Sequence, residues 1–244
     1  MSTLREQAKR IPAAAPLYWM LCRRINYWRL KSKTAEQTFT EIFRNNAWRG
    51  QESASGTGSS TDQTEKIARE LPELFDSFNV STVLDIPCGD FHWMKHVDLS
   101  RVDYTGADIV GDLIQRNITL HSRNGVRFEK LDIIKSKLPR VDLVLCRDCL
   151  VHLSYDAIFD ALNNICNSRS VYLLTTTFTQ RSGNRDIATG QWRTLNFEIA
   201  PFDFLPPIRT IDEGCTEHNG AYRDKALGLW RISDIQKRLR DTSI

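Results

Sequence analysis

Short apolar segments that alternate with helix-like patterns constrain the fold of this chain more than any other feature. Five strand-like segments lie at residues 83–86, 104–108, 126–131, 141–146 and 171–178, and two shorter ones lie near 208–211 and 226–230. Apolar residues at helical spacing separate several of these segments, as in residues 157–165. Strands that alternate with helices predict a parallel sheet with helices on both faces. We therefore expect a doubly wound α/β fold.

Acidic residues follow three successive predicted strands. Asp85, Asp108 and Asp132 stand near the carboxyl ends of these strands, where open α/β sheets bind their ligands. Asp108 lies 23 residues after Asp85, a spacing at which a carboxylate reaches the hydroxyls of a ribose. Asp132 can accept a hydrogen bond from an adenine amine. Each acid alone is also typical of a turn or a helix cap, so the prediction of a nucleoside-containing cofactor rests on all three.

The loop after the first strand argues against two classes of nucleotide-binding protein. A dehydrogenase uses G-x-G-x-x-G to seat a pyrophosphate. Here Gly89 is the one glycine of residues 85–91, with Pro87 and Phe91 in the flanking glycine positions. The chain also lacks the G-x-x-x-x-G-K-[ST] pattern of phosphate-loop NTPases. A cofactor without a pyrophosphate is therefore favoured.

These residues resemble the motifs of class I S-adenosylmethionine-dependent methyltransferases. The resemblance is carried by residues 83–89, Asp108, Asp132 and residues 142–153, and in weaker form it covers the whole chain. It implies a Rossmann-like, mostly parallel sheet of seven strands with the last strand antiparallel, and S-adenosylmethionine as the cofactor. It also implies that Asp85 and Gly89 lie near the amino-acid moiety of the cofactor, Asp108 at the ribose and Asp132 at the adenine.

Three segments resemble a narrower methyltransferase group of unassigned substrate. They are residues 88–94, 146–154 and 224–230. Phe91 departs from the family pattern, because its ring crowds the cofactor unless it turns aside. The cofactor site that we expect draws on the strand ends and on a Gly/Ser-rich loop: Asp85, Pro87, Cys88, Gly89, Asp108, Ile109, Asp132, Ile133, Arg147, Gly56 and Ser59.

The Gly/Ser-rich loop, residues 49–63, precedes a predicted helix and is either a linker or a cover for the cofactor. We predict that it closes over the cofactor, because an open sheet leaves one side of the ligand in water and methyl transfer benefits from a dry site. Gly56 and Gly58 allow the backbone to approach closely. The serines that could donate to the cofactor's carboxylate are Ser53, Ser55 and Ser59.

A hydroxyl acceptor needs a base, and the loop after the fourth strand offers two candidates, Asp148 and His152. Other candidates for this base are Asp186, Glu213, Glu217 and Lys225. The irregular stretch after the fifth strand is expected to form the acceptor wall, in which Trp192 stacks on a ring while Arg193, Asn196 and Glu213 fix hydroxyls. Cys146, Cys149 and His152 match half of a zinc site, but no second ligand pair has matching spacing, so we expect no metal.

The first 50 residues are basic, with ten Lys/Arg against three Asp/Glu, whereas the remainder carries 23 bases and 27 acids. Aromatic residues at 18–28 alternate with arginines and can stack nucleobases, lie on an anionic membrane surface or pack on the chain's own domain. The acidic body and the lack of an Asn/Asp-Pro-Pro-Tyr/Phe motif disfavour nucleic acid as the methyl acceptor.

We expect O-methylation of a small-molecule or glycan hydroxyl. A nucleic-acid or protein methyltransferase and a non-catalytic cofactor-binding protein remain alternatives.

The chain divides into two expected parts. Residues 1–60 form a basic helical extension with the Gly/Ser-rich loop, including a helix capped by Thr34, and residues 61–244 form the methyltransferase domain. No apolar run approaches the ~20 residues that a membrane-spanning helix needs. Sparse cysteines and the lack of a signal-peptide pattern lead us to expect a cytoplasmic protein. The sequence indicates no oligomeric state.

Overall fold

The sheet has seven strands in the order β3-β2-β1-β4-β5-β7-β6, in a computed structural model that describes residues 27–241. The strands are β1 (Thr82–Asp85), β2 (Asp103–Asp108), β3 (Val126–Lys130), β4 (Leu143–Cys146), β5 (Tyr172–Phe178), β6 (Arg209–Asp212) and β7 (Lys225–Arg231). β1 to β5 are parallel, and β7 runs antiparallel to both β5 and β6. The expected doubly wound sheet with an antiparallel last strand is confirmed.

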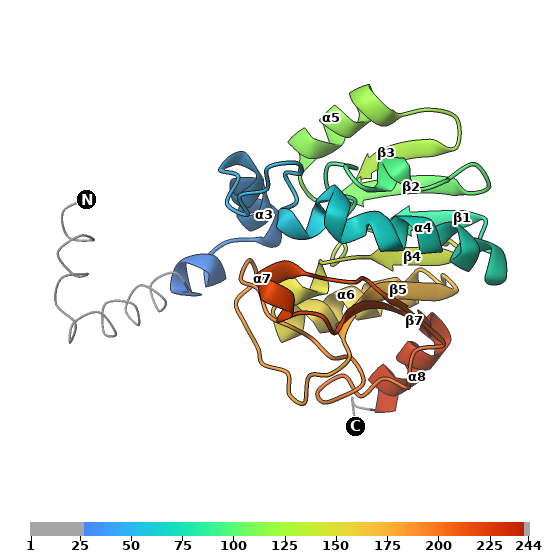
Figure 1. The fold of residues 1–244 in the computed structure, drawn as a ribbon. Helices are drawn as coiled ribbons and strands as arrows, with labels where there is room; N and C mark the ends of the chain where they lie inside the picture. The colour runs from blue at the N-terminus through green and yellow to red at the C-terminus, as the bar shows by residue number, and fades with distance from the viewer. Residues whose placement is uncertain (1–26, 242–244) are drawn as a thin grey trace, which may run out of the picture.

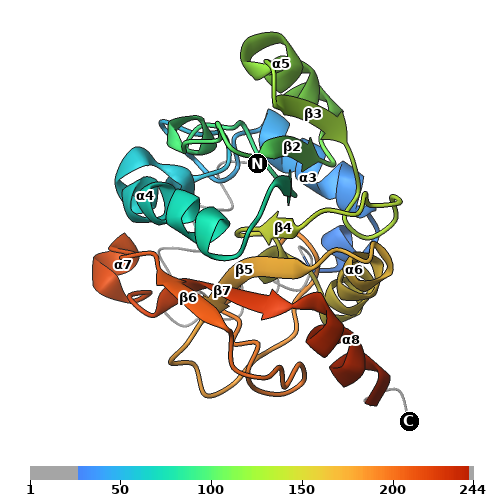
Figure 2. The same cartoon turned by 90° about the vertical axis from the view of Figure 1, so that its right-hand side faces the viewer.

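Helices cover both faces of this sheet. The main ones are α4 (Thr61–Ser77), α5 (Gly111–His121), α6 (Tyr155–Asn167) and α8 (Ile232–Asp241). Figure 2 shows α4 on one side of the sheet and α6 and α8 on the other. The short strands are apolar on both faces, so neighbouring residues such as Leu173 and Leu174 pack into different clusters, as buried parallel strands require.

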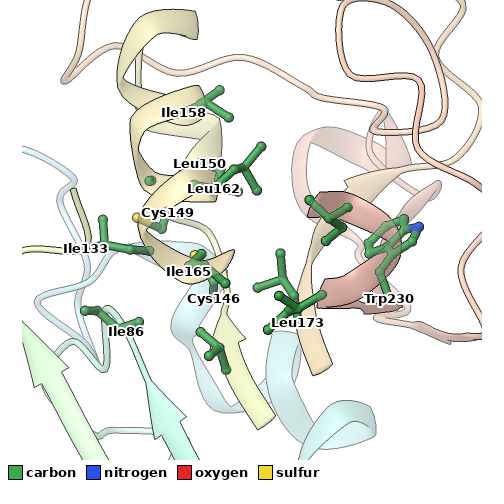
Figure 3. Packing of buried hydrophobic residues seen from close by; sticks show 14 of the residues in the cluster. Ile86, Ile133, Cys146, Cys149, Leu150, Ile158, Leu162, Ile165, Leu173 and Trp230 are labelled. Carbon is green, nitrogen blue, oxygen red and sulfur yellow. The ribbon is translucent and has the colours of Figure 1, made fainter. Parts of the chain in front are cut away.

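The cluster under α6 shows how periodicity builds the core. Ile158, Leu162 and Ile165 recur at helical spacing and are at most 1% exposed. Figure 3 shows them with Leu173 of β5 and Trp230 of β7. Burying each such aliphatic side chain contributes roughly 1.5–3 kcal/mol, so this face stabilises the sheet that positions the site.

Helix α3 (Ala35–Arg44) lies outside these layers, at the carboxyl end of the strands. Thr34 and Gln37 form a capping box at its start, so the predicted N-cap is confirmed. Figure 1 shows α3 and α7 (Glu217–Gly220) at the same end of the strands. Ion pairs between Arg44 and Asp112 (2.9 Å) and between Lys130 and Glu36 (2.6 Å) connect α3 to α5 and β3.

Three single turns complete the elements near the site: η1 (Thr57–Ser59), η2 (Met94–His96) and η3 (Leu150–His152). Residues 179–208 contain no helix or strand, as expected of a functional loop region. Among residues 27–241, no helix is long and apolar enough to cross a membrane. Most of the aromatic and arginine residues that we considered for nucleic-acid or membrane contact lie outside the described residues.

Candidate active site

A cavity of about 520 Å³ opens at the carboxyl ends of β1, β2, β4 and β5. This volume falls in the range of small-molecule sites. Loop 54–59, α3, η3 and α7 also contribute to its wall. The eleven residues expected at the cofactor and the two main base candidates all line this cavity: Asp85, Pro87, Cys88, Gly89, Asp108, Ile109, Asp132, Ile133, Arg147, Gly56, Ser59, Asp148 and His152. Of the other base candidates, Glu217 and Lys225 line it, whereas Asp186 and Glu213 do not.

Gly89 lies at the centre of the turn that follows β1. Its φ is +54°, a conformation that side-chain-bearing residues rarely adopt, and a Cβ there would lie 2.1 Å from the Ser55 hydroxyl. Asn117 Nδ2 donates to the Gly89 carbonyl at 2.7 Å and so fixes the turn. The glycine therefore lets the Gly/Ser-rich loop approach the β1 turn closely.

Phe91 turns away from the cavity. Its backbone has a φ of +58°, its side chain is fully buried, and its ring centroid lies 5.5 Å from that of Tyr104 and 5.1 Å from that of Phe128. The ring therefore packs in a buried aromatic cluster with these two residues. The departure from the family pattern does not crowd the cavity.

Asp85 and Asp108 are buried carboxylates with unusual acidity. Burial and, to a smaller extent, the negative charge of Asp108 raise the pKa of Asp85 to about 7, although the Tyr104 hydroxyl donates to it at 2.5 Å. Burial likewise raises the pKa of Asp108 to about 6, against a hydrogen bond of 2.9 Å from the Val110 amide. Both groups therefore change charge close to neutral pH.

Asp132 sits half-buried at the end of β3. Its Oδ1 accepts from the Ile134 amide at 2.8 Å, and its own amide donates to the Ser136 hydroxyl at 2.8 Å. These two bonds close a tight turn, which is the structural role that a carboxylate after a strand often has. The turn also holds the side chain on the cavity wall.

The Gly/Ser-rich loop is fastened to the β1 turn by Asp90. The two carboxylate oxygens accept from the Ser53 hydroxyl and from the Ala54 amide, both at 2.8 Å. A linker would not need such bonds, so the loop is an ordered wall of the cavity. The expectation that Ser53 donates to the cofactor is wrong, because its hydroxyl donates to Asp90 instead.

The far end of this loop is fastened to the opposite side of the cavity. Thr57 donates to Glu217 Oε1 at 2.6 Å, and Arg147 Nη2 donates to the Gly58 carbonyl at 2.7 Å. Gly56 has a φ of +97°, and a Cβ there would lie 3.2 Å from the Cβ of Trp48. The loop therefore joins the ends of β1 and β4.

Four charged residues form a buried cluster between the ends of β4 and β7. Arg147 Nη2 lies 2.6 Å from Glu213 Oε2, and Lys225 Nζ lies 2.6 Å from Asp148 Oδ2 and 3.3 Å from Glu213 Oε2. Burial favours protonation of Asp148, but the charges of Lys225 and Arg147 outweigh it and lower its pKa to about 2. Asp148 is therefore an ionised partner of these two cations and a weak base.

His152, the other predicted base, has a different environment. Its Nδ1 lies 2.9 Å from the Gln191 carbonyl oxygen, which can only accept, so Nδ1 carries the proton and Nε2 keeps its lone pair in the neutral ring. Its centroid lies 5.0 Å from that of Trp48. Burial lowers the pKa of His152, so the ring is neutral near pH 7. Of the two predicted bases, His152 has the suitable protonation state.

Three residues expected on the acceptor wall are engaged elsewhere. The guanidinium of Arg193, 1% exposed, donates to the Leu150 and Leu153 carbonyls at 2.7 and 2.6 Å. Asn196 Nδ2 donates to the Arg181 carbonyl at 3.0 Å, and Glu213 belongs to the buried cluster. The expectation that they fix acceptor hydroxyls is therefore wrong. Trp192, also expected on this wall, does line the cavity.

Several cavity residues were not anticipated from the sequence. Trp48, Phe178, His218 and Tyr222 all line the cavity. Phe178 is the last residue of β5, so its position at a strand end was the one available signal in the sequence.

Cys146 and Cys149 are buried beside α6 (Figure 3). Across residues 27–241, no group of three or more His, Cys, Asp or Glu side chains is arranged to hold a metal ion.

The sequence matches a family model described as a methyltransferase domain over residues 60–218. The chain belongs to this methyltransferase family. The family model indicates a methyltransferase domain, and the cofactor that the strand-end motifs predict, S-adenosylmethionine, is bound in a solved structure of similar fold. The resemblance seen in the strand-end motifs of this methyltransferase is confirmed. No curated protein matches the sequence.

Solved structures share the fold of this methyltransferase. Human N-acetylserotonin methyltransferase in complex with SAM has a TM-score of 0.56 and 16% identity over 84% of this chain and 61% of that one. The N-methyltransferase NodS from Bradyrhizobium japonicum has a TM-score of 0.52 and 16% identity over 71% of this chain and 98% of that one. The chain therefore spans less than two thirds of the length of the human enzyme.

The residues of the cavity fit this cofactor. The sulfonium and ammonium groups of S-adenosylmethionine are cationic, and carboxylates dominate the charged groups of the wall: Asp85, Asp90, Asp108, Asp132, Asp148 and Glu217 line it against Arg147 and Lys225. The buried Asp85 and Asp108 gain a favourable counter-charge when a cation enters. This methyltransferase therefore has a cavity of suitable charge and size.

Proposed function

We propose that this methyltransferase methylates a hydroxyl of a small-molecule or glycan acceptor, with His152 as the general base. The single observation that carries the proposal is the hydrogen bond between His152 Nδ1 and the Gln191 carbonyl. It orients the ring and leaves Nε2 able to accept a proton on the cavity wall. A hydroxyl acceptor needs such a base, because its proton must leave as the oxygen is methylated.

The cofactor residues follow from the same arrangement. Asp108 would hold the ribose and Asp132 the adenine, while Asp85 and Gly89 would border the amino-acid moiety. Arg147, Gly56 and Ser59 would border it from the Gly/Ser-rich loop and the end of β4. The remaining neighbours are Pro87, Cys88, Ile109 and Ile133. The positions of these residues on one cavity wall support the assignment.

Chemically, the cofactor supplies an electrophilic methyl carbon, and the protein aligns the acceptor and removes its proton. The hydroxyl proton passes to His152 Nε2. The negative charge of Asp148 favours the imidazolium that results, because Asp148 raises the pKa of His152 against the effect of burial. The loop 53–59 excludes water from one side of the cavity.

The extension, residues 1–60, and the domain, residues 61–244, are proposed to act together. Trp48 and residues 54–59 belong to the extension and line the same cavity as the strand ends. The extension would thus complete the site rather than serve as a tether. The nucleic-acid alternative is tested by heparin retention and its salt dependence, with and without residues 1–33.

The decisive experiment compares His152→Gln with the wild type. Labelled methyl transfer is measured with extract fractions that contain glycans, lipids, small molecules, nucleic acids or proteins as acceptors. We expect transfer into a hydroxyl-bearing fraction, with kcat reduced roughly 10²- to 10⁴-fold in the variant. Titration with S-adenosylhomocysteine serves as the control and should give equal affinity for both proteins. Equal turnover would exclude His152 as the base.

A further inference from the structure

Three aromatic rings from separate segments meet on the cavity wall. Phe178 ends β5, Trp192 lies in the irregular segment after it, and Tyr222 precedes β7. The Trp192 and Tyr222 centroids are 4.9 Å apart, and that of Phe178 lies 6.1 and 6.0 Å from them, respectively. The ring planes are inclined by 65° to 84°, an edge-to-face arrangement that favours contact. Together they form a continuous aromatic wall.

A strained turn extends this wall. His218 and Asn219 have φ angles of 50° and 57°, although neither is glycine, and Gly220 follows at 77°. Consecutive left-handed residues are unfavourable for L-amino acids, and such strain is concentrated at functional sites. The His218 ring lies 5.3 Å from that of Tyr222 and lines the cavity. The turn therefore presents a fourth flat ring beside the aromatic wall.

Polar side chains near the aromatic wall are bound to other protein groups. Arg181 Nη2 donates to Asp224 at 2.6 Å and to the Ala221 carbonyl at 2.7 Å. Arg193 and Asn196 donate to backbone carbonyls, as described above. None of these three residues lines the cavity, so a sugar ring packed on the aromatic wall would lose water from its hydroxyls and gain no hydrogen bond from them.

We infer that the acceptor is a planar aromatic compound with a ring hydroxyl, a phenol, packed against Trp192 and Tyr222. This inference rests on the proposed hydroxyl methylation and narrows its acceptor to one chemical class. A phenolic hydroxyl has a pKa near 10, so a histidine can deprotonate it more readily than it can a sugar hydroxyl. That histidine, His152, lines the same cavity as the aromatic wall, and its Nδ1 is bound to the carbonyl of Gln191, the residue that precedes Trp192.

The atoms of the step balance. The phenol oxygen forms a bond to the methyl carbon, and the bond between that carbon and the cofactor's sulfur breaks with its electron pair left on sulfur. The phenolic proton passes to His152 Nε2. The sulfonium charge is lost as the imidazolium charge appears, so no oxidant, reductant or metal is required.

The test uses matched acceptors with the full-length protein and labelled S-adenosylmethionine. Phenol and 2-naphthol are compared with their saturated counterparts, cyclohexanol and 2-decalol, and with methyl glucoside. We expect methyl transfer to the aromatic members at least tenfold faster than to the others. Equal or faster transfer to the saturated alcohols or to the glucoside overturns the aromatic class while leaving hydroxyl methylation intact. No transfer to any hydroxyl counts against the proposed function itself.

Variants of the aromatic wall supply the second arm. Trp192→Leu should raise the KM for the aromatic acceptor about three- to tenfold, with the affinity for S-adenosylhomocysteine unchanged. Trp192→Phe, which keeps a ring, should restore most of this loss. Trp28→Leu is the matched control, because Trp28 is 63% exposed and does not line the cavity. An equal KM for Trp192→Leu and Trp28→Leu would overturn the inference.

Discussion

The Nδ1 atom of His152 lies 2.9 Å from the carbonyl oxygen of Gln191, and this contact links the turn after β4 to the irregular segment after β5. The carbonyl fixes one tautomer of the imidazole. Burial lowers the pKa of the same ring, and the positive charge of Arg193 lowers it further. A histidine that is held neutral and oriented has the properties of a general base.

The first prediction is a pH profile. Since the base acts when unprotonated, kcat should fall as the pH decreases through the pKa of His152. Burial places this pKa below the usual histidine value of about 6.5, so kcat should be constant from pH 7 to 8 and fall only at a pH below that usual value. Single-turnover rates across pH 5–9 measure it. An inflection above pH 7, or none, would contradict His152 as the base.

The second prediction concerns Asp85 and Asp108. Their raised folded pKa values mean that the free protein binds more protons than the unfolded chain, so this stabilisation is present at low pH and is lost as the pH rises through about 6 to 7. Asp85→Asn should therefore raise the unfolding free energy at pH 8 by about 1 to 3 kcal/mol. Its affinity for S-adenosylhomocysteine should fall at least tenfold.

Chemical denaturation at pH 5 and pH 8 gives the control for Asp85→Asn, because the gain in stability should shrink at pH 5. In the wild type, affinity for S-adenosylhomocysteine should rise between pH 5 and pH 8 as the two carboxylates ionise. A flat affinity profile, with Asp85→Asn no more stable than the wild type, would show that burial does not raise the pKa values of these two carboxyl groups.

The third prediction tests whether the Gly/Ser-rich loop is part of the site. Gly56→Ala places a methyl group 3.2 Å from Trp48 at a φ of +97° and should weaken S-adenosylhomocysteine binding about tenfold. Gly125→Ala is the matched control, since Gly125 also has a positive φ, of +76°, and lies in the turn before β3. Both variants should lose similar stability. Equal binding by the two would make the loop a tether.

Local sequence patterns predicted the frame of the site well. Asp85, Asp108 and Asp132 could be placed on one cavity because parallel strands bring their carboxyl ends to one edge, whatever the packing. The N-cap at Thr34 was also predictable, since a capping box depends only on neighbouring residues.

Side-chain direction in the irregular segment could not be read from the sequence. Trp192 and Arg193 are adjacent, yet one lines the cavity and the other is buried against carbonyls of η3 and its neighbour. The backbone path that separates them is set by contacts distant in sequence, such as that of Gly190 with Thr38 of α3. Likewise, Phe91 turns into the core because Tyr104 and Phe128 from other strands provide the aromatic contact.

The last prediction addresses the buried charge cluster. Lys225→Met removes the cation that contacts both Asp148 and Glu213 and leaves two carboxylates with one guanidinium, Arg147. Breaking a buried pair leaves an uncompensated charge, so the unfolding free energy should fall by about 3 to 5 kcal/mol. The charge of Lys225 also holds the pKa of Asp148 near 2, so wild-type stability from this carboxylate is present above the ordinary aspartate pKa of about 4 and is lost as the pH falls towards 2. In Lys225→Met this loss should begin at a higher pH.

Lys66→Met is the control, because the Lys66–Asp212 pair is exposed and its removal should cost less than about 1 kcal/mol. Denaturation curves of both variants at pH 3, 5 and 7 decide the matter, and similar losses at pH 7 would mean that the cluster contributes no more than a surface pair.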